Sequence, residues 1–451
     1  MTNAMGLLLP AYFLACLLLG GASNGGFVAN FALQISGLAI VLIAVATLPR
    51  KPGFHLDPRF RSLVLFSGVI VGLQFVPLPL SVWTSLPGRE AIAAELALLG
   101  VTPSATFVSL SIHDSLASLA WMLPAACFLA AMWFQLEVPA LQIALALIGG
   151  TLIAIALGLV QFFGGVDSFA YLYEITNRGL MVGVFANANH MATLLLATLP
   201  FLTAVVRSQI VVRESARREL LLLWAVLVGF IVLAIGLVGS LTGYALLLPV
   251  LVLCGMMLLP GSRKKLLTAL LGAFAIGIGL VSLTDEGGNV FSEDAALSER
   301  GRQQIFSVTL EANEEFWPVG TGLGTFRDIY DNYEDRNSVS NVYVNHAHSD
   351  YLEVALEMGL AGVAGIVAFL AWWLSRLRAI WVGRATDPFV HAAAIASGTI
   401  LVHSGWDYPL RTATLSTLFA FCCVLMGQLQ LRTIEKNPAK SSDRRSKTSG
   451  G

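Results

Sequence analysis

The chain has 451 residues, of which 56% are hydrophobic and only 12% are charged, and its net charge is −1. This composition excludes an ordinary soluble globular protein, and the near-neutral charge gives no reason to expect a nucleic-acid partner. Apolar segments long enough to cross a bilayer recur along the sequence. The sequence therefore predicts an all-α polytopic membrane protein surrounded by a lipid bilayer.

Twelve apolar segments are candidates for membrane-spanning helices. They cover about residues 5–22, 27–48, 62–80, 115–134, 138–163, 185–206, 219–238, 242–260, 265–283, 352–375, 389–406 and 412–430. In domain terms, residues 1–283 are expected to hold spans one to nine, residues 284–350 a large loop with short helices, and residues 351–431 spans ten to twelve. The Ser, Lys, Arg and Gly composition of residues 432–451 cannot build a core, which predicts a disordered tail.

Positive charge is divided unevenly between the two sides of the predicted membrane. If the amino terminus is cytoplasmic, twenty of the 27 Lys and Arg residues fall on the cytoplasmic side. The positive-inside rule requires such an asymmetry, and the reverse orientation would violate it at nearly every loop. We therefore expect both termini in the cytoplasm and the large loop 284–350 on the opposite side.

Several kinds of metal and cofactor site are not indicated. All five cysteines lie in apolar segments, which argues against a disulfide framework or a Cys-rich metal site. No outside loop carries an Asp-x-Asp pair for a divalent cation, and no Gly-rich loop with Lys-Ser/Thr could cradle a nucleotide. We expect neither a metal nor a cofactor.

The large loop has its own helical pattern. Residues 297–312 look helical, with a modest apolar face. Further on, Phe326, Ile329, Tyr330 and Tyr333 repeat at the spacing of an amphipathic helix. Such a helix could lie on the membrane face and cover a cleft.

Two histidines, His346 and His348, precede the apolar segment 352–375. An imidazole titrates near pH 6.5 in water, so it can accept a proton at neutral pH. A solvated loop histidine is the plain alternative. A metal site is less favoured, because further ligands at a familiar spacing are missing.

Two basic segments could hold an anion on the loop side. Arg178 precedes Asn187 and Asn189, which either cap an apolar helix or line a pocket for a substrate headgroup. Arg302 lies in the large loop, where a guanidinium could bind phosphate oxygens or simply offset nearby Glu299.

A third ionisable group occurs in HSGWDYPLRT, which contains His403, Asp407 and Arg411 between the last two apolar segments. Ionisable residues at membrane depth are costly and usually have a purpose. The alternative is structural, with Asp407 and Arg411 paired across the turn.

Taken together, these segments resemble the O-antigen ligase and O-antigen polymerase superfamily. His348, Ser349, Gly359 and Gly362 match its pattern H-[N/S/Q]-x9-G-x-x-G in full. The segments RGLMVGVFANANHMA, GRQQIFSVTLEANEEFWPVGTGLGTF and HSGWDYPLRT resemble three further parts of that family in the same order. The resemblance covers roughly residues 1–430.

The resemblance implies metal-independent transfer of a glycan from an undecaprenyl diphosphate carrier to an acceptor hydroxyl. The reaction would take place at the periplasmic face of a bacterial inner membrane. His348 would be the base that activates the acceptor, and Arg178, Arg302 and Arg411 would bind the diphosphate. The remaining assignments are substrate lining by Asn187, Asn189, His346 and Ser349, and close helix packing at Gly359 and Gly362.

The acceptor remains open at this stage. A ligase would use the lipid A-core of lipopolysaccharide, whereas an O-antigen or exopolysaccharide polymerase would use another lipid-linked repeat unit. We favour the ligase slightly. Other polysaccharide-assembly proteins are a further open partner class.

Two other classes of function compete with an enzyme. A transporter without chemistry would carry charged residues near the middle of the membrane. Here the ionisable residues gather at the outer ends of the predicted spans instead. A scaffold for polysaccharide assembly is the third possibility.

Overall fold

The computed structural model describes residues 2–23, 28–47, 57–103, 105–133, 140–259, 272, 293–334, 344–383 and 387–428. Within them the chain is almost entirely helical, and β1 (Pro77–Leu78) pairs with β2 (Thr106–Phe107) in one short antiparallel sheet. The predicted all-α class is confirmed. The predicted span at 265–283, apart from residue 272, and the tail at 432–451 lie outside the described residues.

The helices follow the predicted order. The first part of the chain forms α1 (Thr2–Leu19), α2 (Val28–Thr47), α3 (Pro58–Leu73), α4 (Leu80–Trp83), α5 (Arg89–Leu98), α6 (Ile112–Trp133), α7 (Ala140–Gly164), α8 (Ala188–Val212), the 3-10 helix η1 (Glu214–Ala216), α9 (Arg217–Val238) and α10 (Leu241–Leu258). The second part forms α12 (Glu293–Phe316), α13 (Phe326–Tyr333), α14 (Asp350–Trp381), α15 (Pro388–His403), the 3-10 helix η3 (Pro409–Arg411) and α16 (Ala413–Gly427).

Several of these helices could cross a membrane. Among the described residues, seven are long and apolar enough to do so, and three shorter apolar helices accompany them. The five cysteines are free and buried in these apolar helices, as predicted. The chain is therefore a multi-pass membrane protein, while the full set of twelve spans stays a prediction.

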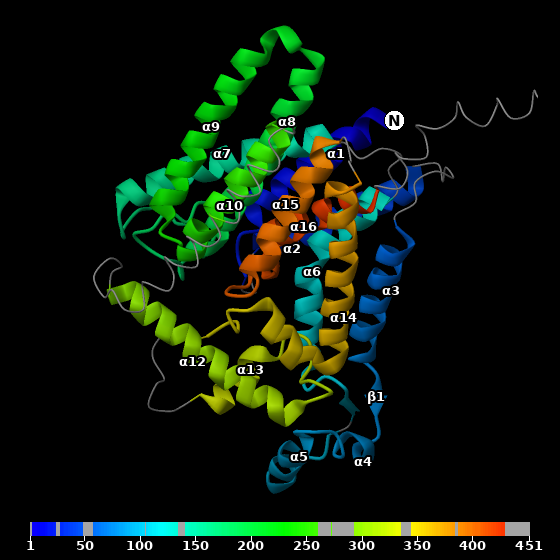
Figure 1. Ribbon diagram of the computed structural model, residues 1–451. Helices are drawn as coiled ribbons and strands as arrows, with labels where there is room; N and C mark the ends of the chain where they lie inside the picture. The colour runs from blue at the N-terminus through cyan, green and yellow to red at the C-terminus, as the bar shows by residue number, and fades with distance from the viewer. Residues whose placement is uncertain are drawn as a thin grey trace, which may run out of the picture.

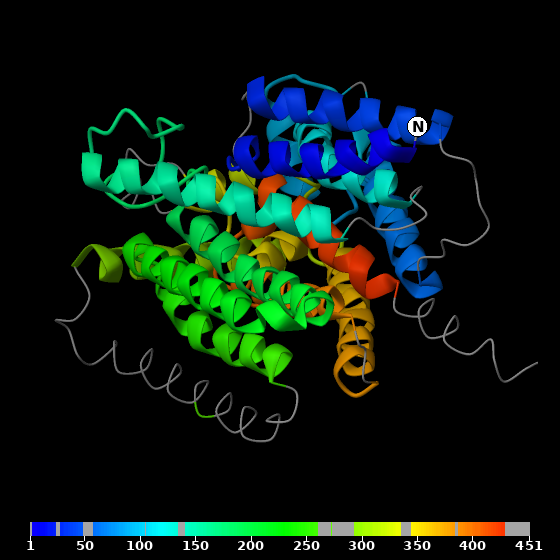
Figure 2. The ribbon, with the colours of Figure 1, turned by 90° about the horizontal axis from the view of Figure 1, so that it is seen from above.

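Helix α8 is enclosed on nearly all sides. Almost every residue from His190 to Ala204 is buried, which is typical of a helix that is apolar all round and packed within a bundle. It contacts α7, α9, α10 and α15, and α7 lies between α1 and the α8–α10 group (Figure 2). Helix α15 also packs on α16, and α8 contacts η3, the 3-10 helix between them.

The loop helices form a second small core outside the main bundle. Figure 1 shows α12 and α13 beyond the ends of α15 and α16, beside the first turns of α14. Phe326, Ile329 and Tyr330 of α13 are buried with Ile305 of α12 and Leu356 of α14. The amphipathic pattern predicted α13 correctly, but its apolar face packs on α12 and α14.

Helix α14 is broken at Gly359. This residue has φ 56° and ψ −144°, a conformation outside the helical region that a side chain would strain. The chain segment after α12 caps the break: the N–H groups of Thr321 and Gly322 donate to the carbonyls of Leu356 and Glu357, at 3.0 and 2.8 Å. The N–H of Leu360 donates in turn to Pro318 O, at 2.9 Å.

The two glycines of the His-Ser…Gly-Gly pattern therefore have a role different from the predicted helix packing. A Cβ on Gly359 would lie 2.2 Å from Pro318 O, and one on Gly362 would lie 2.6 Å from Met358 Cβ of the preceding turn. Both contacts are made at the break itself. The glycines let the chain change direction there and let the 318–324 turn approach its backbone.

Arg89 of α5 fixes this turn from the other side. Its side chain is fully buried, and its guanidinium donates to the carbonyls of Pro87, Val108 and Gly320 at 2.9, 2.8 and 2.7 Å. Burial lowers the pKa of Arg89 to about 10, which leaves it charged at neutral pH.

We predict that Gly359→Ala destabilises the protein by about 2 kcal/mol or more, because it adds left-handed backbone strain to an overlap with Pro318. The measurement is the thermal unfolding temperature in detergent. Gly365→Ala is the matched control on the same helix, since the nearest atom to its new Cβ is 3.8 Å away. Equal unfolding temperatures for the two variants would contradict the assigned role of the break.

Candidate functional site

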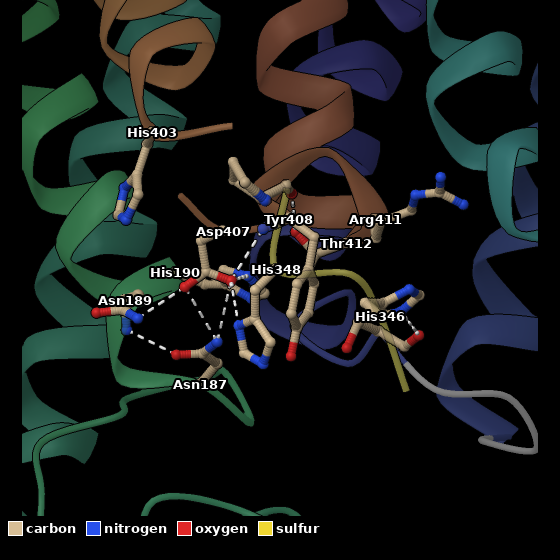
Figure 3. Close-up of polar contacts among 12 residues, drawn as sticks. Asn187, Asn189, His190, His346, His348, His403, Asp407, Tyr408, Arg411 and Thr412 are labelled. Carbon is tan, nitrogen blue, oxygen red and sulfur yellow. Dashed lines mark hydrogen bonds and ion pairs between the residues drawn. The ribbon is translucent and has the colours of Figure 1, made fainter. Parts of the chain in front are cut away.

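Five helix ends meet at the candidate site. The start of α8 supplies Asn187, Asn189 and His190, and the residues before α14 supply His346 and His348. The segment between α15 and α16 supplies Asp407, Tyr408 and Arg411, and the end of α1 closes one side through Ser23. Figure 3 shows most of these side chains around Asp407 and Tyr408.

Asp407 is the centre of the cluster. Its carboxylate is fully buried and accepts hydrogen bonds from Asn189 Nδ2 at 2.7 Å, from the Tyr408 N–H at 2.9 Å and from Asn187 Nδ2 at 3.4 Å. The Nε2 of His190 lies 3.5 Å away, and the Nδ1 of His348 lies 3.8 Å away. The side chain of Asp407 therefore joins α8 to the segment before α14.

The charge on Asp407 is stabilised by these neighbours. Burial acts to raise its pKa, but the hydrogen bond of His190, and the attraction to the imidazoles of His190, His348 and His403 in their protonated forms, hold that pKa well below its usual range. A buried carboxylate with this many donors is ionised at neutral pH. It is an acceptor for imidazole N–H groups.

The two asparagines owe their positions to the start of α8. Asn187 is the N-cap residue, and its side-chain oxygen accepts the N–H of Asn189 at 2.8 Å. The amide nitrogens of both side chains are thereby left to face Asp407. Asn187 therefore caps α8, one of the two sequence alternatives, and its side-chain amide also lies beside Asp407.

Among the imidazoles of the site, that of His348 is the most exposed to solvent. It adopts φ 51°, which is uncommon for a residue other than glycine, and its side chain is 23% exposed. The next residue, Ser349, is the N-cap of α14 and donates to Ser404 O at 3.3 Å. Figure 3 shows Nδ1 of His348 turned to Asp407 and the opposite ring edge turned away from it.

His348 is neutral at pH 7. Burial lowers its pKa from the ordinary value; the carboxylate of Asp407 opposes that shift, and the charges of Arg302, His346 and His190 add to it. A neutral imidazole with one nitrogen facing a carboxylate and the other facing outward can accept a proton.

Tyr408 separates His348 from His346. Its ring centroid lies 5.1 Å from that of His348, 4.5 Å from that of His346 and 5.0 Å from that of His190. His346 is held at both nitrogens, by Glu353 at 2.9 Å and by Ser23 O at 3.1 Å. Both ring nitrogens of His346 are thus engaged by the scaffold.

The pKa values of His346 and His348 are consequently shifted in opposite directions. Burial acts to lower the pKa of His346, but the charge of Glu353 and its hydrogen bond outweigh this, and the pKa is raised. Adjacent histidines in the sequence therefore lie in opposite environments. Only His348 combines a lowered pKa with access to the outside.

Arg411 forms ion pairs with three carboxylates. Its guanidinium lies 3.7 Å from Asp350, 3.3 Å from Glu353 and 3.2 Å from Glu357. These acids occur at i, i+3 and i+7 on α14 and so share one helix face. The sequence left open a pairing of Arg411 with Asp407; the structure gives the two residues different partners.

The other two arginines lie apart from this network. The Arg302 side chain extends from α12, and its charge acts on His348. Arg178 lies on the exposed loop between α7 and α8, where its guanidinium contacts Val166 O at 3.2 Å and the Tyr171 ring at 5.4 Å. The structure thus brings Arg302 toward His348 and directs Arg178 to its own loop.

The pairing of Arg411 with three acids of α14 and the central place of Tyr408 were not predicted from the sequence. The spacing of Asp350, Glu353 and Glu357 on one helix face was an available signal. Within the described residues, no three His, Cys, Asp or Glu side chains are placed to hold one metal ion.

One family model matches the chain. Residues 224–367 match the model described as O-antigen ligase. The matched segment runs from α9 into α14 and includes Arg302, His348 and the break at Gly359. No curated protein matches the chain closely enough to count as a relative.

We predict that Arg411→Met costs roughly 3–5 kcal/mol of stability, because it leaves buried carboxylates on α14 without their cation. Thermal unfolding in detergent measures this loss. The matched control is Arg178→Met, whose exposed guanidinium faces only its own loop, and it should leave the unfolding temperature nearly unchanged. A stable Arg411→Met protein that has lost only donor binding would show instead that Arg411 serves the diphosphate.

Proposed function

We propose that the chain belongs to the O-antigen ligase and polymerase superfamily, whose family model matches residues 224–367, and that it is a metal-independent membrane glycosyltransferase. It transfers a glycan from an undecaprenyl diphosphate carrier to an acceptor hydroxyl. The proposed location is the periplasmic face of a bacterial inner membrane, with both termini in the cytoplasm. The distribution of Lys and Arg in the sequence supports this orientation.

The observation that supports the chemistry best is the Asp407–His348 pair. The carboxylate faces Nδ1 of His348, and the ring is partly exposed with a lowered pKa. In this arrangement Nδ1 carries the proton toward Asp407, and Nε2 has a free electron pair for the acceptor hydroxyl. His348 is the general base, and Asp407 orients it.

The proposed step is a single substitution at the anomeric carbon. The acceptor O–H gives its proton to Nε2 of His348 while its oxygen forms the new bond to that carbon. The bond from the same carbon to the diphosphate oxygen breaks, and the undecaprenyl diphosphate leaves with the electron pair. The His348 imidazolium is stabilised by the ionised Asp407.

The leaving diphosphate needs positive charge close to the base. We assign this role to Arg302, whose charge acts on His348. Arg178 is a second proposed ligand of the diphosphate; because its guanidinium contacts its own α7–α8 loop in this structure, it would have to turn toward the site when the donor binds. A planar guanidinium binds phosphate oxygens through two parallel hydrogen bonds and keeps its charge at any physiological pH. Arg411 is a poorer diphosphate ligand, because three carboxylates already compensate its charge.

The acceptor distinguishes two closely related activities. We propose an O-antigen ligase, with the lipid A-core as acceptor. An O-antigen or exopolysaccharide polymerase would use the same donor, base and diphosphate ligands, and would take a second lipid-linked repeat unit as acceptor. A transporter is not favoured, because it gives the exposed, neutral His348 and its ionised partner no role.

We predict that His348→Asn lowers glycan transfer by about 10²- to 10⁴-fold, the usual range for loss of a general base. Asn tolerates the positive φ at this position, so the variant should fold. His113→Asn at the exposed start of α6 is the matched control and should transfer normally. In the wild type, activity should fall on the acid side of the pH profile (the acid limb) below about pH 6.5, because transfer fails once His348 is protonated. Near wild-type transfer by His348→Asn would exclude it as the base.

We predict that a strain that lacks the gene shows the surface glycans expected for a missing ligase. These are long chains that stay on the carrier and a lipid A-core that carries no glycan. A missing polymerase leaves single repeat units attached to the core. Gel separation of the surface lipopolysaccharide distinguishes the two patterns. Single repeat units attached to the core would contradict the ligase assignment.

A further inference from the structure

One oxygen of Asp407 faces two imidazoles. The Oδ1 atom lies 3.5 Å from Nε2 of His190 and 3.8 Å from Nδ1 of His348. Neither imidazole nitrogen has a closer hydrogen-bond partner. The two rings come from different elements, α8 and the segment before α14, and both pack against the ring of Tyr408 (Figure 3).

The other acceptor positions of this carboxylate are filled. Asn189 Nδ2 donates to Oδ2 at 2.7 Å, and the Tyr408 N–H donates to Oδ1 at 2.9 Å. Asn187 Nδ2 lies 3.4 and 3.5 Å from the two oxygens. The remaining capacity of Oδ1 is therefore shared between the two imidazoles.

The two imidazoles differ in access. The side chain of His190 is 1% exposed, whereas that of His348 is 23% exposed. His190 cannot reach an acceptor sugar from this position, and the mechanism gives it no proton to carry. His190 faces the site through its Nε2, which lies beside Oδ1 of Asp407.

We propose that His190 is a positioning residue that sets the basicity of His348 by sharing Oδ1 of Asp407. This rests on the proposed function only in taking His348 as the base. When Nε2 of His348 takes the proton of the acceptor hydroxyl, the distance from Nδ1 of His348 to Oδ1 of Asp407 shortens. A second donor on the same oxygen weakens that interaction, and so the imidazolium of His348 is stabilised less than it would be by Asp407 alone.

Other charged groups also face this pair and have to be held constant. Arg302 from α12 and His346 act on His348, and His403 at the end of α15 acts on Asp407. Nδ1 of His403 is hydrogen-bonded to Oγ1 of Thr193 in α8, at 2.5 Å. None of these residues is changed in the test below.

The test compares His190 variants with and without a donor. His190→Phe and His190→Leu remove the Nε2–H, so Asp407 binds the His348 imidazolium more strongly, and the acid limb of the pH profile should move upward by about 0.5 unit or more. His190→Gln places an amide N–H near the position of Nε2, and its acid limb should return to that of the wild type. The same shifts should appear in NMR titration of the His348 ring, assigned with His348→Asn.

The outcomes separate three explanations. A purely structural role for His190 predicts less inserted protein in the apolar variants with an unmoved acid limb and an unmoved His348 titration, which contradicts the proposal. Insertion of His190→Gln but of neither apolar variant also contradicts it, because the donor would then be needed for folding. A wild type that transfers no glycan contradicts the proposed function instead, while the NMR titration still decides the role of His190.

Discussion

The organisation of the site depends on the ionised carboxylate of Asp407, held without exposure to solvent between α8 and the segment before α14. An isolated charge in such a place would cost several kcal/mol. Here the two asparagine amides, the Tyr408 N–H and the imidazoles compensate it. The helix ends that carry these groups are held together because each contributes a donor to the same carboxylate. His348 takes its orientation from this carboxylate, and among the imidazoles of the cluster it is the most exposed to solvent.

A second ionic network holds the first part of α14 in place beneath His348. Arg411 pairs with three acids of that helix, and Glu357 also accepts the Gly324 N–H at 2.8 Å. The break at Gly359 lets this short part of α14 leave the line of the rest of the helix. The 318–324 turn donates to the carbonyls at the break, and Arg89 in turn donates to Gly320 O of that turn. The glycine pattern in the sequence and the position of His348 are thus parts of one structural unit.

Much of this could be predicted from the sequence, because it depends on local pattern. Long apolar segments predicted the helices, and the spacing of Phe326, Ile329 and Tyr330 predicted an amphipathic helix where α13 lies. The match of residues 224–367 to the O-antigen ligase model supports, for that segment, the resemblance that His348 and Gly359 indicated.

What could not be predicted depends on contacts between distant segments. Asp407 and Arg411 are four residues apart and of opposite charge, yet the 3-10 helix η3 directs them to different partners. The two glycines occur in a helical sequence, where close packing is the simplest explanation, and only the approach of Pro318 reveals the break. Arg89 carries no signal of burial, because its three acceptors are backbone carbonyls from three separate places.

The most direct measurement is an electron cryo-microscopy structure of the protein in a lipid nanodisc with a non-transferable undecaprenyl diphosphate glycan. The account predicts that the diphosphate lies within hydrogen-bonding reach of Arg302, about 3 Å, and that the anomeric carbon lies between it and Nε2 of His348. A diphosphate bound away from His348, or a His348 ring turned from Asp407 toward the cytoplasm, would contradict it.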